Sequence, residues 1–185
     1  MRQLMRRDLY SVLTPFFITF SLSVHAAPLT NYIKDGYVHF YGKVVNAGCS
    51  VATDSQDQTV QMGQIRSNTF SSLGEWNDPH YFQIKLEDCS TDVTKTVGIM
   101  FTGESDGKDP LVFRTGNHAG ASNGVGIGIS DSLGHLLVPN TSPVRYSPLE
   151  EGETVLNYTA RYRATSRNVI PGDASTQVWF SLYYQ

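Results

Sequence analysis

The sequence is poor in three features that would point to common classes of function. It has 2 cysteines and no Cys-x-x-Cys or His-x₃-His spacing, so a zinc site built on them would lack two ligands. Its 14 lysines and arginines are outnumbered by 17 aspartates and glutamates, which argues against the basic face that a nucleic-acid partner requires. After position 26, no apolar run approaches the length of about 20 residues that a membrane span needs.

The N-terminus has the pattern of a secretory signal peptide. Three arginines among the first seven residues precede an apolar stretch, which is interrupted by Pro15 and closes on the small residue Ala26. The apolar stretch is too short for a membrane anchor. We therefore predict that residues 1–26 are a leader removed on export, with cleavage after Ala26 or, alternatively, after Ala27. The exported protein is expected to have no direct membrane insertion.

The remaining 159 residues suit one domain and scarcely allow two. The leader contains three basic residues and one acidic residue, so 11 basic and 16 acidic residues remain, with a formal charge of −5. This charge again argues against a nucleic-acid partner and identifies no other partner.

The two cysteines, Cys49 and Cys89, are predicted to form a disulfide, because paired cysteines in an exported protein usually do. The loop that they close has 41 residues, for which the chain-entropy estimate of stabilisation is about 4 kcal/mol. A metal site is the alternative, but the sequence offers no further ligands at a suitable spacing.

Short alternations of apolar and polar residues recur along the chain and predict strands rather than helices. The predicted strands lie within residues 38–44, 60–62, 82–86, 97–101, 125–129, 156–164 and 176–185. Clusters of Gly, Pro, Asn, Asp and Ser separate them. Only residues 69–73 are predicted to form a turn or two of helix. Several strands with one apolar face each favour an all-β fold, a two-sheet antiparallel sandwich.

The last predicted strand is the most informative. Val178, Phe180, Leu182 and Tyr184 alternate with more polar residues, which is the pattern of a strand with one buried face. Chain ends usually fray unless something holds them. Either the fold or a partner must therefore cover this apolar row.

One motif resembles a hydrolase site. The segment 120–124 matches Gly-x-Ser-x-Gly around Ser122, and Asp131 and His135 follow in the chain order of an α/β-hydrolase triad. That motif needs a strand-to-helix turn, whereas a predicted strand follows here. We interpret the segment as a loop and expect no catalytic residues, metal or cofactor. A self-contained secreted sandwich that binds or hydrolyses a ligand is kept as the alternative function.

Taken in order, these segments resemble the pilin subunits of chaperone–usher pili, particularly type 1 fimbriae. The matching segments are 36–49, 58–65, 86–89 and 160–164, together with a tail that has an aromatic residue next to last and Gly172 fourteenth from the end. Within the family, segments 88–91 and 178–182 are most similar to the fimbrin-like accessory subunit of type 1 pili.

The resemblance implies an immunoglobulin-like β-sandwich that lacks its last strand, which leaves a groove beside the C-terminal strand. A periplasmic chaperone would fill the groove first, and the N-terminal arm of another pilin subunit would replace it at the outer-membrane usher. The chain would then be a structural subunit assembled by donor-strand exchange into a fimbrium at the bacterial cell surface, where it supports adhesion. The residues implied to bind the chaperone or donor strand are Gly172, Val178, Phe180, Leu182 and Tyr184.

The resemblance also implies that residues 27–40 form a donor-strand arm ahead of a pilin domain at 41–185. The inward row of the arm would be Lys34, Gly36, Val38 and Phe40, with the glycine at a crowded part of the partner groove. Lys34 departs from an all-apolar donor face. A lectin domain fused ahead of the pilin domain, as in tip adhesins, does not fit within 159 residues.

Overall fold

The computed structural model of the protein describes residues 37–42 and 48–185. The chain divides into two units, Met1–Gly42 and Lys43–Gln185, which are considered separately. The strands and helices assigned in the described residues all belong to the second unit. None of those helices is long and apolar enough to cross a membrane.

The larger of two sheets is antiparallel throughout. Its hydrogen-bonded order is β1 (Ser50–Val51), β2 (His80–Cys89), β8 (Gly152–Ala164), β5 (Val125–Asp131) and β4 (Phe113–Arg114), with β6 (Leu136–Leu137) also paired to β5. The long strand β8 alternates between buried and more exposed residues, as a strand with one face on the core must.

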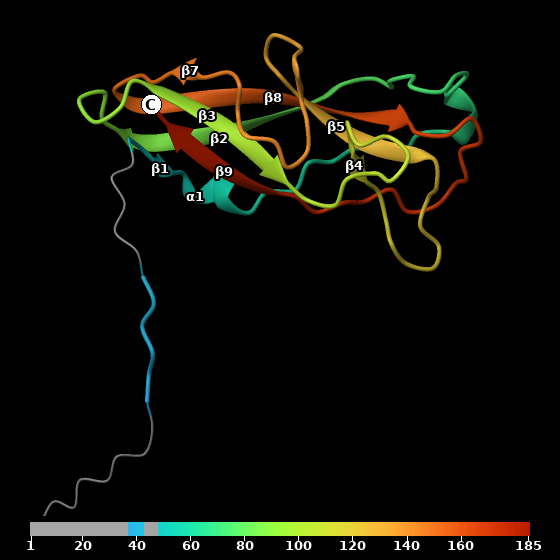
Figure 1. Cartoon of the computed structure of the whole chain (residues 1–185), viewed down its shortest axis with the longest axis horizontal. Helices are drawn as coiled ribbons and strands as arrows, with labels where there is room; N and C mark the ends of the chain where they lie inside the picture. The colour runs from blue at the N-terminus through green and yellow to red at the C-terminus, as the bar shows by residue number, and fades with distance from the viewer. Residues whose placement is uncertain (1–36, 43–47) are drawn as a thin grey trace, which may run out of the picture. The chain divides into compact units, whose positions relative to one another are not determined.

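The smaller sheet has three strands in the order β7 (Ser147–Pro148), β3 (Thr96–Thr102) and β9 (Trp179–Tyr184). Figure 1 shows β3 and the dark red β9 lying side by side, with β2 and β8 in the other layer. The predicted antiparallel β-sandwich is therefore confirmed.

Aromatic side chains from both sheets meet in the core. The ring of Phe101 on β3 lies edge-on to Tyr158 on β8, with centroids 5.4 Å apart, and Phe82 on β2 is 5.6 Å from the same tyrosine. Leu86 and Phe113 are fully buried in the same cluster. Such offset and edge-on contacts stabilise a core beyond the area that they bury.

The predicted disulfide is also confirmed. Cys49 immediately precedes β1 and is bonded to Cys89, the last residue of β2. Both residues are buried in the core cluster.

Three local predictions are wrong. The strand predicted at 38–44 is not assigned at residues 38–42, and its last two residues lie outside the described part of the chain. Residues 60–62 are not in a strand, because no backbone hydrogen bond joins residues 57–65 to another described residue and a ladder needs a bonded neighbour. The helix predicted at 69–73 is reduced to a 3₁₀ turn, η1 (Ser67–Thr69). There the carboxylate of Glu75 accepts hydrogen bonds from the amides of Ser71 and Ser72, which replaces helical bonding by a local turn.

One short helix was not predicted. Helix α1 (Thr53–Gln56) is a single turn without apolar periodicity. Its buried Ser55 accepts a hydrogen bond of 3.1 Å from the amide of Lys85 on β2, so a tertiary contact stabilises it.

Candidate functional site

The C-terminal strand β9 lies at the edge of the smaller sheet. It pairs with β3 from Thr102↔Trp179 to Val97↔Tyr184, and no described strand pairs with its other edge. An edge strand offers unpaired backbone N–H and C=O groups to any extended chain that reaches it.

The ladder determines which backbone groups face the open edge. Gln185 and Thr96 exchange two hydrogen bonds, Gln185 N–H to Thr96 O at 3.1 Å and Thr96 N–H to Gln185 O at 3.0 Å. Since bonded and non-bonded pairs alternate in antiparallel sheets, the backbone groups of Tyr184, Leu182 and Phe180 point to the open edge. These residues also carry the inward side chains.

The inward side chains of the C-terminal segment are only partly buried. Val178, Phe180, Leu182 and Tyr184 pack against the main core cluster. The ring of Phe180 lies 6.4 Å from that of Phe101. Burial raises the pKa of the Tyr184 phenol, whose hydroxyl donates a 3.2 Å hydrogen bond to the backbone carbonyl of Cys49.

A groove of about 1420 Å³ opens beside this segment. One wall is formed by residues 169–180, and the facing wall by residues 55–65, Ser67 and Phe70. The floor includes Ile127 on β5 with Ala160 and Tyr162 on β8, each at most 7% exposed. The apolar side chains on the facing wall are Val60, Met62, Ile65 and Phe70.

Gly172 belongs to the wall of this groove. A Cβ atom at Gly172 would lie 2.5 Å from the backbone carbonyl carbon of Ala121 and 2.5 Å from the amide nitrogen of Ser122. Any side chain there would therefore displace backbone rather than a flexible neighbour. The close approach accompanies a β-bridge between Asp173 and Ala121.

An ion pair fastens the same turn. His118 Nε2 lies 3.0 Å from a carboxylate oxygen of Asp173, which also lines the groove. Hydrogen bonds to the Ala119 carbonyl and to Asp173 raise the pKa of His118. Hydrogen bonds from Ser175 and from His118 lower the pKa of Asp173.

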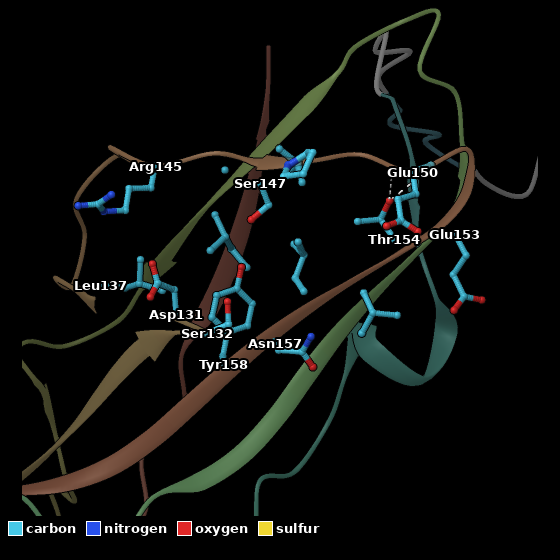
Figure 2. A pocket seen from close by; sticks show the side chains of 16 residues that line it. Asp131, Ser132, Leu137, Arg145, Ser147, Glu150, Glu153, Thr154, Asn157 and Tyr158 are labelled. Carbon is cyan, nitrogen blue, oxygen red and sulfur yellow. Dashed lines mark hydrogen bonds between the residues drawn. The ribbon is translucent and has the colours of Figure 1, made fainter. Parts of the chain in front are cut away.

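A second, smaller cavity of about 390 Å³ lies between β3, β7 and β8 (Figure 2). Its wall is more polar and includes Asp131, Ser147 and Tyr158. Burial and the nearby Asp131 carboxylate raise the pKa of the Tyr158 phenol. That carboxylate already accepts hydrogen bonds from Leu133 and His135. Among the described residues that line this cavity, none belongs to β9.

The hydrolase-like triad is not assembled. The hydroxyl of buried Ser122 lies 3.1 Å from that of Thr115, whereas His135 Nδ1 lies 3.0 Å from Asp131. Serine and histidine therefore bond to different partners, and a strand, β5, follows the loop as expected.

The structure brings five predicted site residues together. Gly172, Val178 and Phe180 line the groove, and Leu182 and Tyr184 continue the inward row along β9. In the other unit, Val38 and Phe40 are 77% and 91% exposed. The predicted arm residues Lys34 and Gly36 lie outside the described residues.

Sequence reasoning did not predict the facing wall or the floor as parts of the site. The alternation of Val60 with Met62 is a usable signal for an apolar row, although it also predicts a strand that does not form. The sequence places the floor residues Ile127 and Ala160 in strands, but only the pairing of β5 with β8 brings them under one groove.

Comparisons with known proteins agree with this geometry. The sequence model of the family described as fimbrial protein matches residues 38–185. The chain is 40% identical over 153 residues to the fimbrin-like protein FimI of Salmonella typhi, covering 82% of this chain and 86% of that protein. It is 39% identical over 172 residues to long polar fimbria protein A of Salmonella typhimurium, covering 91% and 96%.

Solved structures show the same fold. The P pilus rod subunit PapA superposes with a TM-score of 0.64 at 27% identity, covering 75% of this chain and all of that one. A subunit from the structure of a chaperone–usher pilus gives a TM-score of 0.63 at 29% identity, with 82% and 96% covered. The predicted immunoglobulin-like pilin sandwich is confirmed by these likenesses together with the sheet topology.

Proposed function

The chain belongs to the fimbrial protein family and is a structural subunit of a pilus, and from this premise we propose that the groove beside β9 accepts a β-strand donated by a partner. The observation that carries the proposal is the coincidence at β9 of an open edge, an inward apolar row and a groove with an apolar floor.

An added strand would provide hydrogen-bond partners for the open edge of β9 and would also cover its inward apolar row. Its backbone would bond to the outward-directed groups of Phe180, Leu182 and Tyr184, and its alternate side chains would enter the groove. Each apolar side chain transferred from water to such a groove contributes about 1.5–3 kcal/mol. The facing wall at 58–65 would also gain the bonded neighbour that it lacks.

We propose two successive occupants of the groove, as in chaperone–pilin pairs, an established example of strand addition. A periplasmic chaperone supplies the first strand and covers the apolar row of β9 during export. At the outer-membrane usher, the N-terminal arm of another pilin subunit replaces that strand. The assembled subunits form a fimbrium at the cell surface.

The donor segment of this chain is the arm at residues 27–40. Val38 and Phe40 are two residues apart and exposed, so they are available to another molecule and would share one face of an extended strand. Their alternation suits a groove with pockets for every second residue. The role is structural rather than enzymatic, in keeping with the separate partners of Ser122 and His135.

The test uses the mature chain, residues 27–185, refolded with and without a synthetic peptide of residues 27–42. We expect the peptide to be retained and to raise the thermal unfolding midpoint. A matched peptide carrying Phe40→Asp should do neither, because a carboxylate would be buried. A mature chain that is a stable monomer, with a midpoint that the native peptide does not change, would support the self-contained sandwich instead.

A further inference from the structure

The outward face of β9 is also incompletely covered. Its outward row consists of Trp179, Ser181 and Tyr183, and Trp179 is 62% exposed. On the β3 side, Gly98 lies opposite Tyr183 and is covered by the loop that carries Tyr146, whose ring would lie 2.9 Å from a Cβ at Gly98. The flank toward the open edge has no such cover among the described residues.

The arm has a matching outward row. Tyr37, His39 and Tyr41 alternate with Val38 and Phe40. The rings of His39 and Tyr41 stack with centroids 6.2 Å apart, so these two side chains share one face. Tyr37 and Tyr41 are 84% and 92% exposed.

The two rows have the same spacing, because alternate residues of a strand are about 6.7 Å apart. A strand that places Val38 and Phe40 in the groove must place its tyrosines on the outer face of the smaller sheet. If the rows are aligned antiparallel, Tyr41 lies beside Trp179, and Tyr37 lies beside Tyr183. The smallest residue of the β9 row, Ser181, then faces His39.

We propose that the outer row of β9, Trp179–Ser181–Tyr183, is a second recognition surface for the donated strand, and that its occupant is residues 37–41 of a second copy of this chain. The inference rests on the proposed function of the groove. A donor strand with a polar outer row could still fill the groove, but it would leave Trp179 uncovered. The outer row thus favours this chain's own arm over other strands with similar inward residues.

The test measures release of a labelled peptide of residues 27–42 from the mature chain, using the native peptide and a Tyr37→Thr/Tyr41→Thr peptide. Threonine keeps strand propensity and removes the ring. The release of each peptide is measured from the native acceptor and from the Trp179→Thr acceptor. Tyr81→Thr is the control acceptor, because Tyr81 is 79% exposed on β2 in the other sheet.

Fluorescence gives a second readout. The chain has 2 tryptophans, so a Trp76→Phe background leaves Trp179 as the only one. Bound native peptide should shield Trp179 from acrylamide quenching, and the threonine peptide should shield it less. A peptide with Tyr41→Phe should shield Trp179 as well as the native peptide does, since the ring rather than the hydroxyl makes the contact.

Cross-strand aromatic pairs predict that the threonine peptide leaves the native acceptor about three- to tenfold sooner. The difference should shrink in Trp179→Thr to the share of the remaining pair of Tyr37 with Tyr183, and it should persist in full in Tyr81→Thr. Equal release rates with unshielded Trp179 would overturn the outer-row proposal and leave the groove intact. If the native peptide itself fails to bind, the proposed function is overturned, and the outer-row proposal with it.

Discussion

The hydroxyl of Tyr184 donates a 3.2 Å hydrogen bond to the backbone carbonyl of Cys49, 135 positions earlier in the chain. Cys49 is itself bonded to Cys89 at the end of β2. The last residue of the edge strand is therefore tied to the covalent link of the opposite sheet. This contact holds the C-terminal end of β9, while its open edge stays available.

Replacing Tyr184 by Phe should remove this hydrogen bond and keep the ring. A typical buried hydrogen bond contributes about 1 kcal/mol, so the free energy of unfolding should fall by about that amount in urea titration. Tyr183→Phe is the matched control, because the Tyr183 hydroxyl contacts only the weak acceptor sulfur of Met100, at 3.8 Å. Equal losses of unfolding free energy in the two variants would show that the hydrogen bond to Cys49 does not stabilise the fold.

Removal of the disulfide should cost more. Cys49→Ser/Cys89→Ser is expected to lower the free energy of unfolding by about 4 kcal/mol, since the closed loop contains 41 residues. Denaturant unfolding with and without dithiothreitol checks this value, because the reductant should destabilise the native protein and leave the variant unchanged. A native protein that is insensitive to full reduction would contradict the prediction.

Gly172 should not tolerate even a methyl group. In Gly172→Ala, the Cβ would meet the backbone of Ala121 and Ser122, so the turn at 170–173 must move away from the loop at 120–123. We expect a lower unfolding midpoint and weaker retention of the arm peptide. Gly107→Ala is the matched control, because a Cβ at Gly107 meets nothing within 4 Å. Equal behaviour of the two variants would mean that the close approach has no consequence.

The sequence predicted those parts of the fold that a local pattern specifies. Alternation located parts of β2, β3, β5 and β8 and all of β9, whose predicted range was longer than the strand, and it assigned Phe180 and Leu182 to the inward face. Helix α1 escaped prediction because its stability depends on the contact between Ser55 and Lys85, which are far apart in the chain. A local sequence pattern cannot predict a contact between residues that are so far apart in the chain.

The groove could be predicted only in part, for a related reason. Val60 and Met62 have the alternation of a strand, yet the structure gives them no bonded partner among the described residues. A period-2 pattern reports which face is apolar and says nothing about whether a neighbour is present. The floor formed by Ile127 and Tyr162 depends on the pairing of β5 with β8, which the sequence does not reveal residue by residue.

The ion pair between His118 and Asp173 predicts a pH dependence of stability. The pKa of His118 is raised in the folded protein, so its stabilisation is complete below about pH 6.5 and is lost as the pH rises through the raised value. The pKa of Asp173 is lowered, so its stabilisation is present above its unfolded value and is lost as the pH falls through the lowered one.

Urea midpoints measured between pH 6 and pH 9 should therefore fall more steeply for the native protein than for His118→Gln. The comparison variant is His135→Gln, because His135 is paired with Asp131 in a different loop. If His118→Gln follows the native pH profile, the ion pair at the end of the groove does not contribute to stability.

The roles of arm and groove predict two separable defects in one protein. Phe180→Ala should act on the acceptor side, because it removes an inward ring that packs against Phe101. Its free energy of unfolding should fall by about 2 kcal/mol, which is less than the loss of about 3–5 kcal/mol for a fully buried phenylalanine, since Phe180 is only partly buried. The variant should retain neither chaperone nor arm peptide well. Tyr81→Ala is its control, because Tyr81 is an exposed aromatic residue on β2 in the other sheet.

Changes in the arm should act later in assembly. Deleting residues 27–40, or replacing Gly36 by Leu, should leave the domain folded and still able to retain a native arm peptide, because the groove is formed by residues after 50. The same variants should fail to enter the groove of another subunit, so incorporation into pili should be lost in cells that also express the chaperone and usher. If the arm deletion were incorporated as well as the native chain, the arm would not be a donor. The chain would then accept a strand without giving one, and its place would be at an end of the polymer.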